Sequence, residues 1–159
     1  MGSLWVAQWS GGAEWKGPIG VFTAEIDGCP GEGYVAVRVA GDVDTGTRAE
    51  LSDALERALA IGSRSVLVDL TAVQFFAAAG VHCVERAVGA LEARGGAAHV
   101  VCPRPGPAWR VVSLLGLQQQ WLVHQDVEAA IAGCTALQGA VRSFGVPHES
   151  VVVPAPRRA

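Results

Sequence analysis

The chain has 159 residues, a net charge of −3 at pH 7 and an isoelectric point near 5.8. Half of its residues are hydrophobic and 17% are charged, which fits one folded domain and excludes a disordered, highly charged chain. The acidic balance argues against nucleic acid as a partner, and no apolar run reaches the roughly 18 residues of a membrane span.

Composition divides the chain into three zones. Residues 1–19 are rich in Gly and Trp and are interpreted as an extension that is either flexible or a docking segment; they lack the basic and apolar regions of a signal peptide. Residues 20–137 alternate strand-like and helix-like patterns and are predicted to form the domain. Residues 138–159 contain three prolines and end near two arginines, which indicates a mobile tail.

The first half of the domain is predicted to be a β-hairpin followed by a helix. Val21–Ile26 and Tyr34–Ala40 have strand patterns and are separated by a stretch dense in turn residues. Thr47 and Glu50 have the spacing of a capping box. The apolar residues that follow recur at helical spacing until Gly62, which should end the helix.

The second half alternates further strands and helices. Ser65–Leu70 is apolar on both faces, as expected of a buried central strand; a loop should follow it, and a helix should then run from Ala78 to Ala93. The remaining predicted elements are a strand at Ala97–Cys102, a helix at Pro107–Leu115, an edge strand at Trp121–Val123 and a helix that Asp126 caps and that ends near Leu137. This order predicts an α/β fold with a mixed sheet of about five strands packed against about four helices.

Three alanines, Ala77 to Ala79, occupy the start of the helix that follows the central strand. A helix N-terminus has unpaired N–H groups and is normally capped by Ser, Thr, Asp or Asn, and an Ala in the cap position costs about 1 kcal/mol. Just before the alanines, Phe75 and Phe76 are adjacent. Either one ring points outward and forms an apolar contact patch, or both rings are buried. Packing alone does not account for alanines at this position.

These segments together resemble the STAS domain, the fold of bacterial anti-sigma factor antagonists and of the cytoplasmic ends of sulfate transporters. The resemblance covers residues 20–137 and rests on Gly41-Asp42-Val43-Asp44 before a helix, Val68 to Phe76, Gly80-Val81, Arg94-Gly95-Gly96 and Leu114-Leu115-Gly116-Leu117. In phosphoregulated members the loop reads Asp-Ser-Ser-Gly, and its first Ser is phosphorylated by the anti-sigma factor. Aligned with that loop, Asp falls on Ala77, the acceptor Ser on Ala78 and the second Ser on Ala79; only Gly80 is retained.

The resemblance implies a non-enzymatic, cytoplasmic interaction module that binds an anti-sigma factor of the ATPase-kinase type and regulates transcription. Its implied partner-binding surface comprises Asp44, Thr45, Thr47, Phe75, Phe76, Ala77, Ala78, Ala79, Gly80 and His82. Because Ala78 has no hydroxyl, the module should act constitutively or be regulated differently. Asp44 is equally well explained as a turn residue, and Thr71, the nearest hydroxyl, is more typical of a strand or turn than of an alternative phosphoacceptor.

No spacing of His or Cys forms a metal-ligand set, and no acid–base pair or activated nucleophile is evident, so we predict no metal, no cofactor and no enzymatic activity. Two other functions stay open. One is an accessory subunit of a transport or larger signalling complex, and the other is a small-molecule sensor that uses the hairpin side of the sheet. The oligomeric state also stays open, a homodimer included.

Overall fold

The computed structural model describes residues 22–29 and 33–143, so the predicted extension at 1–19 lies outside it, as do residues 144–159 of the predicted tail. Within these ranges the chain forms five strands, four α-helices and one short 3-10 helix. Their order is β1 (Thr23–Cys29), β2 (Tyr34–Val43), α2 (Arg48–Ala60), β3 (Ser65–Phe76), α3 (Ala78–Ala93), β4 (Ala97–Val101), α4 (Pro107–Leu114), η1 (Leu117–Gln119), β5 (Leu122–His124) and α5 (Val127–Ser143). The predicted α/β class and its mixed sheet are confirmed.

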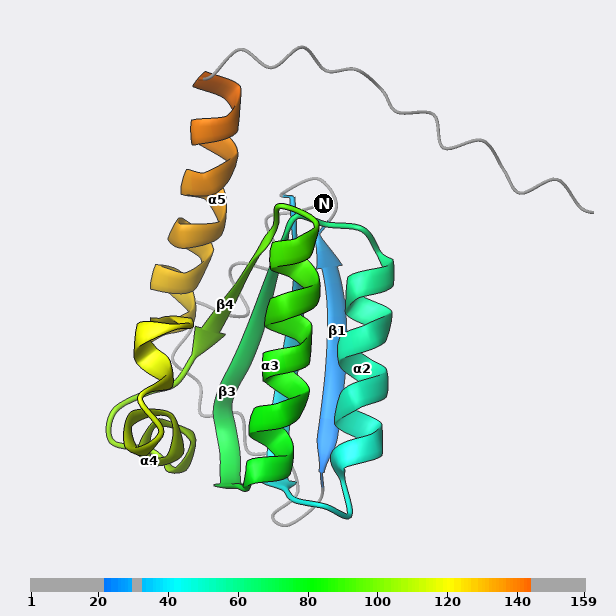
Figure 1. Cartoon of the computed structure of the whole chain (residues 1–159), viewed down its shortest axis with the longest axis vertical. Coiled ribbons are helices and arrows are strands. Elements are labelled where there is room, and N and C mark those ends of the chain that lie inside the picture. The colour runs from blue at the N-terminus through cyan, green and yellow to red at the C-terminus, as the bar shows by residue number, and fades with distance from the viewer. Residues whose placement is uncertain (1–21, 30–32, 144–159) are drawn as a thin grey trace, which may run out of the picture.

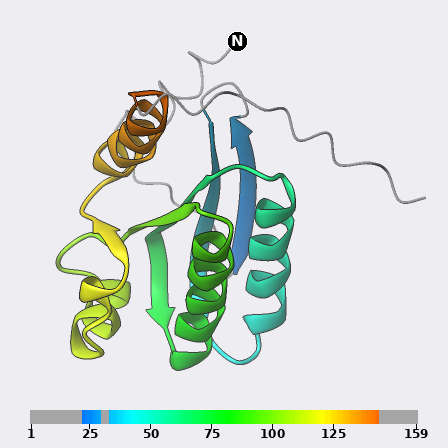
Figure 2. The ribbon, with the colours of Figure 1, turned by 45° about the horizontal axis from the view of Figure 1, so that its top comes forward.

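The five strands form one sheet in the order β1-β2-β3-β4-β5. β1 is antiparallel to β2, and every other neighbouring pair is parallel. Figures 1 and 2 show α2 and α3 side by side over the same face of the sheet, with α5 beyond β4. Because β2 and β3 are parallel neighbours, the segments that follow them emerge at the same edge of the sheet.

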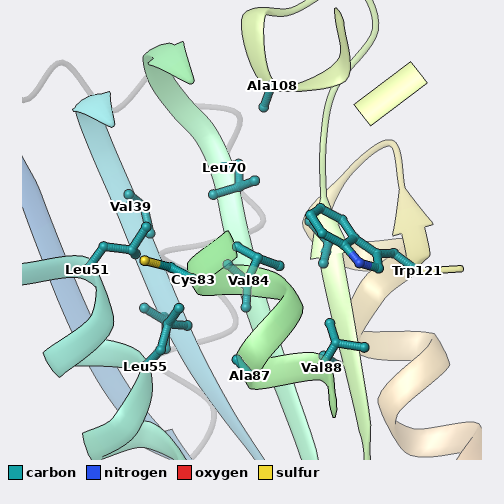
Figure 3. Close-up of a cluster of buried hydrophobic side chains, with 14 of the residues drawn as sticks. Val39, Leu51, Leu55, Leu70, Cys83, Val84, Ala87, Val88, Ala108 and Trp121 are labelled. Atoms are coloured by element: carbon teal, nitrogen blue, oxygen red, sulfur yellow. The ribbon is translucent and has the colours of Figure 1, made fainter. Parts of the chain in front are cut away.

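Each face of the central strands has its own apolar cluster, because alternate side chains of a strand point to opposite faces. The larger cluster joins Val35, Val37 and Val39 of β2 to the buried faces of α2, α3 and α4, and Figure 3 shows Trp121 beside Val88 at its margin. The smaller cluster lies between the sheet and α5 and consists of Tyr34, Ala36, Leu67, Val101, Ala130 and Cys134. Both faces of β2 and β3 are therefore covered, which explains their nearly continuous apolar sequence.

The prediction that the central strand ends at Leu70 and gives way to a loop is wrong. β3 continues to Phe76, and its second half pairs with the second half of β2, from Ala40 opposite Ala72 to Val43 opposite Phe76. The register between the two strands shifts twice along this stretch. At each shift β3 carries one residue more than β2, which breaks the alternation by which a strand is recognised in sequence.

The ends of the helices agree with the sequence at most positions. Gly62 and Gly95 follow α2 and α3 with φ of +84° and +73°, as expected of glycines that end helices. Asp126 Oδ1 accepts a hydrogen bond from the Ala129 N–H at 2.8 Å, which confirms the predicted cap of α5. Several predicted boundaries differ: β1 continues past Ile26 to Cys29, and β2 continues past Ala40 to Val43. β5 begins one residue after Trp121, and α5 continues past Leu137 to Ser143.

Candidate functional site at the edge where β2 and β3 end

Two segments far apart in sequence meet where β2 and β3 end. Val43 and Phe76, the last residues of the two strands, are register partners, and the Ala77 N–H donates to the Val43 carbonyl at 2.8 Å. The turn at 44–47 and the start of α3 therefore lie side by side, at the lower end of the molecule in Figure 1. The sheet thus brings the two halves of the predicted surface together, and we call this region the loop edge: residues 44–47 and 75–82.

The turn at 44–47 is held by its own side chains. Asp44 Oδ1 accepts hydrogen bonds from the N–H groups of Gly46 at 2.8 Å and Thr47 at 3.1 Å. The Thr47 hydroxyl donates to the Asp42 carbonyl at 2.9 Å and accepts from the Asp44 N–H at 3.0 Å. Asp44 therefore has the turn role that the sequence offered as one of two alternatives.

The predicted capping box at Thr47 is wrong. Thr47 is the residue before α2, but its side chain makes no capping hydrogen bond and its backbone is already near-helical, with φ −105° and ψ −3°. A capping residue normally has extended backbone, which aims its oxygen at the first turn of the helix. Here the hydroxyl faces backward, into the turn, because the Asp42 carbonyl and the Asp44 N–H engage it.

The start of α3 has no polar side chain to cap it. Ala77 holds the cap position with an extended backbone, φ −92° and ψ 170°, no side chain caps the helix, and its first turn contains no acidic residue. Ala78 is exposed and Ala79 is buried. The positive end of the helix dipole therefore lies uncompensated beneath a small, apolar surface.

Phe75 and Phe76 diverge, which is the first of the two alternatives that the sequence left open. Phe75 is 53% exposed at the end of β3, whereas Phe76 is 3% exposed and belongs to the larger core cluster. Phe76 is held by Gly80, whose absent side chain lets the ring approach. A Cβ added at Gly80 would lie 2.6 Å from Phe76 Cε2 and 2.6 Å from Val43 Cγ1.

The ten predicted surface residues fall into two groups. Phe76, Ala79 and Gly80 are buried, so they shape the loop edge from beneath. The exposed or partly exposed members are Asp44, Thr45, Thr47, Phe75, Ala77, Ala78 and His82. His82 lies one turn into α3 with its Nδ1 3.5 Å from the Glu85 carboxylate. The outward surface thus combines an apolar patch of Phe75, Ala77 and Ala78 with the polar turn at 44–47 and with His82.

Thr71 lies within β3 and not at a strand end. Its hydroxyl donates to Asp69 Oδ1 at 2.5 Å, and the same oxygen accepts from the Thr71 N–H at 2.9 Å. Asp69 itself is only 6% exposed. The hydroxyl that the sequence offered as an alternative phosphoacceptor is therefore engaged at the first register shift, away from the start of α3.

The chemistry of the described residues is poor in reactive groups. Burial, assisted by Asp69, raises the pKa of the Cys102 thiol to about 12, and burial raises the pKa of the Cys134 thiol to about 12 as well. Such thiols stay protonated and unreactive. Across residues 22–29 and 33–143, no three His, Cys, Asp or Glu side chains are placed to hold a metal ion. The two best-formed hollows have volumes of about 160 and 130 Å³, and neither is lined by the loop edge.

A polar arrangement that the sequence did not indicate is a contact between His99 and His124, whose rings meet beneath α5. The two residues are 25 positions apart, on strands whose pairing could not be known from spacing alone.

Fold and loop edge together define the class of protein: a small mixed-sheet α/β domain in which the ends of β2 and β3 bring the 44–47 turn beside the start of α3. The family model of the STAS domain matches residues 23–130, and the chain belongs to the STAS domain family. In the part of the chain that the structure describes, no helix combines the length and the apolar character needed to cross a membrane.

Solved structures share this fold. An anti-sigma factor antagonist from Mycobacterium paratuberculosis is 23% identical, with a TM-score of 0.66 over 74% of this chain and 97% of that one. The phosphorylated form of the Bacillus cell fate determinant SpoIIAA is 21% identical, with a TM-score of 0.51 over 69% and 96% of the two chains. The unphosphorylated form of SpoIIAA gives 19% identity and a TM-score of 0.50 over 79% and 100%. At these sequence identities the likeness to the solved structures concerns the fold alone. A comparison with curated proteins found no match to the chain.

Proposed function

We propose that this chain is a non-enzymatic, cytoplasmic interaction module that binds an anti-sigma factor of the ATPase-kinase type through the loop edge and thereby regulates transcription. Membership of the STAS family and the fold shared with anti-sigma factor antagonists support this proposal. The exposed surface of the loop edge also supports it, because a small apolar patch around Phe75 and Ala78 suits contact with another protein better than chemistry on a substrate.

The observation that carries the proposal is the residue at position 78. Ala78 is exposed as the first residue of α3. The resemblance to phosphoregulated members of the family aligns this position with their phosphoacceptor Ser. A phosphate at this place would add about −1.5 to −2 charges to an apolar surface. Ala78 has no hydroxyl to receive one, and the hydroxyl of Thr71 is bound to Asp69. Position 78 therefore cannot gain a phosphate charge, and the loop edge stays competent to dock whatever the activity of the kinase.

The test is binding to a purified ATPase-kinase-type anti-sigma factor, followed by calorimetry with and without ATP. The wild-type chain should bind equally in both conditions and take up no radiolabelled phosphate. Ala78→Asp should weaken binding at least tenfold, or about 1.4 kcal/mol, since it places a charge at the centre of the contact. Ala132→Asp, at an exposed position of α5, is the matched control and should bind like the wild type.

A second substitution tests the assignment of position 78 directly. Ala78→Ser restores the hydroxyl and should make the chain a substrate for the kinase, with label confined to residue 78 and with ATP-dependent loss of binding. Unchanged binding by Ala78→Asp, or stoichiometric labelling of the wild-type loop, would contradict the proposal. In a pull-down from cell lysate, recovery of a membrane transport ATPase in place of an anti-sigma factor would favour the accessory-subunit alternative. The sensor alternative gains no support from the hollows, since small-molecule sites usually exceed about 300 Å³.

A further inference from the structure

Two histidines form a contact beneath α5, on the side of the sheet that α2 and α3 do not cover. His99 of β4 has its Nδ1 3.0 Å from Nε2 of His124 on β5, and the ring centroids are 5.2 Å apart. His99 is 2% exposed, and its Nε2 is buried with no hydrogen-bond partner among the described residues. The pair is thus one hydrogen bond between two imidazoles, in a setting that supplies no second bond to His99.

α5 rests directly on these two rings. A Cβ added at Gly133 of α5 would lie 2.9 Å from His99 Nδ1 and 3.2 Å from His124 Cε1. The helix backbone can approach this closely only because residue 133 is a glycine. Next to it, Cys134 is fully buried in the smaller apolar cluster. The contact of α5 with the sheet therefore includes the histidine pair.

The hydrogen bond requires one ring to donate and the other to accept, so at least one facing nitrogen must be unprotonated. When the pair takes up one proton, the hydrogen bond between the rings persists only if His99 Nε2 carries a hydrogen. That nitrogen is buried and has no hydrogen-bond partner among the described residues. A second proton places two donors and two positive charges face to face. Burial and the neighbouring His124 lower the pKa of His99 to about 4, and burial lowers the pKa of His124.

The neighbouring elements offer little compensation for added charge. Their titratable groups are Tyr34 of β2, Asp69 of β3, Cys102 after β4, Asp126 before α5, and Glu128 and Cys134 of α5. Of these, Asp126 acts to raise the pKa of His124, but its carboxylate is engaged in capping α5. No carboxylate in the described ranges is hydrogen-bonded to either ring.

We propose that the His99–His124 pair is a proton-sensitive latch: neutral, it holds α5 on the sheet, and protonated, it releases α5 and uncovers the apolar face formed by Tyr34, Ala36, Leu67 and Val101. The sign follows from burial. The released state binds protons more readily than the closed state between pH 6.5 and about 4, so closure is favoured above this window and is lost as the pH falls through it. The latch is independent of the loop edge, which lies at the ends of β2 and β3.

Hydrogen exchange followed by mass spectrometry on the full chain tests the latch. Protection of peptides from α5 is compared at pH 7.5 and pH 4.5 after correction for intrinsic exchange rates, with peptides from α3 as the internal reference. We expect α5 to lose protection about 10- to 100-fold more than α3 at the lower pH. In the double variant His99→Leu/His124→Leu, and in His124→Gln, this difference should shrink.

Equal loss of protection in α3 and α5, or unchanged protection of α5 at pH 4.5, would overturn the latch. A pH response that persists in full in both variants would overturn it as well. Circular dichroism at pH 7.5 shows whether each variant is folded. If both variants fail to fold, the comparison of α5 with α3 in the wild-type chain decides by itself.

Discussion

Gly80 is the residue at which the loop edge is most sensitive to added volume. Its missing side chain leaves room for Phe76 and Val43, and a Cβ would lie 2.6 Å from an atom of each. Both neighbours are almost fully buried, at 3% and 0% exposure, so neither can move aside cheaply. Overpacking of this kind costs about 1–3 kcal/mol. Gly80→Ala should therefore destabilise the fold, although Ala is the better helix former by about 1 kcal/mol.

The same helix supplies the control. Gly89 is an exposed residue of α3, and a Cβ added there meets nothing within 4 Å. Gly89→Ala should stabilise the chain by about 1 kcal/mol. Because the gain in helix propensity is common to both substitutions, the two variants should differ by the overpacking cost, about 1–3 kcal/mol in the free energy of unfolding, measured by urea denaturation at pH 7.5. If Gly80→Ala is as stable as Gly89→Ala, the close packing of Phe76 and Val43 on α3 is not what fixes the loop edge.

Four further outcomes follow from particular contacts. Ala77→Ser should raise the free energy of unfolding by about 1 kcal/mol, measured by urea denaturation, because the extended backbone at Ala77 suits a capping residue. Asp126→Ala should cost about 1 kcal/mol and increase amide exchange at the start of α5, since the acceptor for the Ala129 N–H is lost. Gly96→Ala brings a Cβ within 2.4 Å of the Arg64 carbonyl and should cost about 1–3 kcal/mol in urea denaturation. Because the folded state holds His99 at a pKa of about 4 in place of 6.5, stability should fall by up to about 3 kcal/mol as the pH drops through that window, and His99→Leu should flatten the decline.

Most of the fold could be predicted from the sequence because local signals and tertiary structure agree over most of the chain. The capping of α5 by Asp126 and the glycines after α2 and α3 are local events that depend on a few neighbouring residues. The second half of β3 is different. Its pairing with β2 depends on two register shifts, and a shift is a property of two strands together.

The same reason explains one wrong side-chain prediction, at Thr47, and one contact that was not foreseen, between His99 and His124. Thr47 has the spacing of a capping residue, but the preceding turn uses its hydroxyl, and that turn closes only because β2 continues to Val43. His99 and His124 become partners only through the pairing of β4 with β5. Contacts of this kind follow from strand pairing, which a single sequence does not reveal.

The extension of β3 to Phe76 changes what the three alanines mean. If they lay in a flexible loop, Ala77 to Ala79 would indicate only that polar side chains are absent there. Here the Ala77 N–H is bound to the end of β2, and Gly80 is locked against Phe76 and Val43, so the alanines sit on a rigid support. Core packing holds the surface of these three alanines in place, and none of them has a side chain that can become charged. The shape of this surface is therefore fixed. Partner selection by such an edge should therefore depend on how the partner fits Phe75 and the 44–47 turn, which makes Phe75→Ala a stronger test of recognition than any change to the charge of the turn.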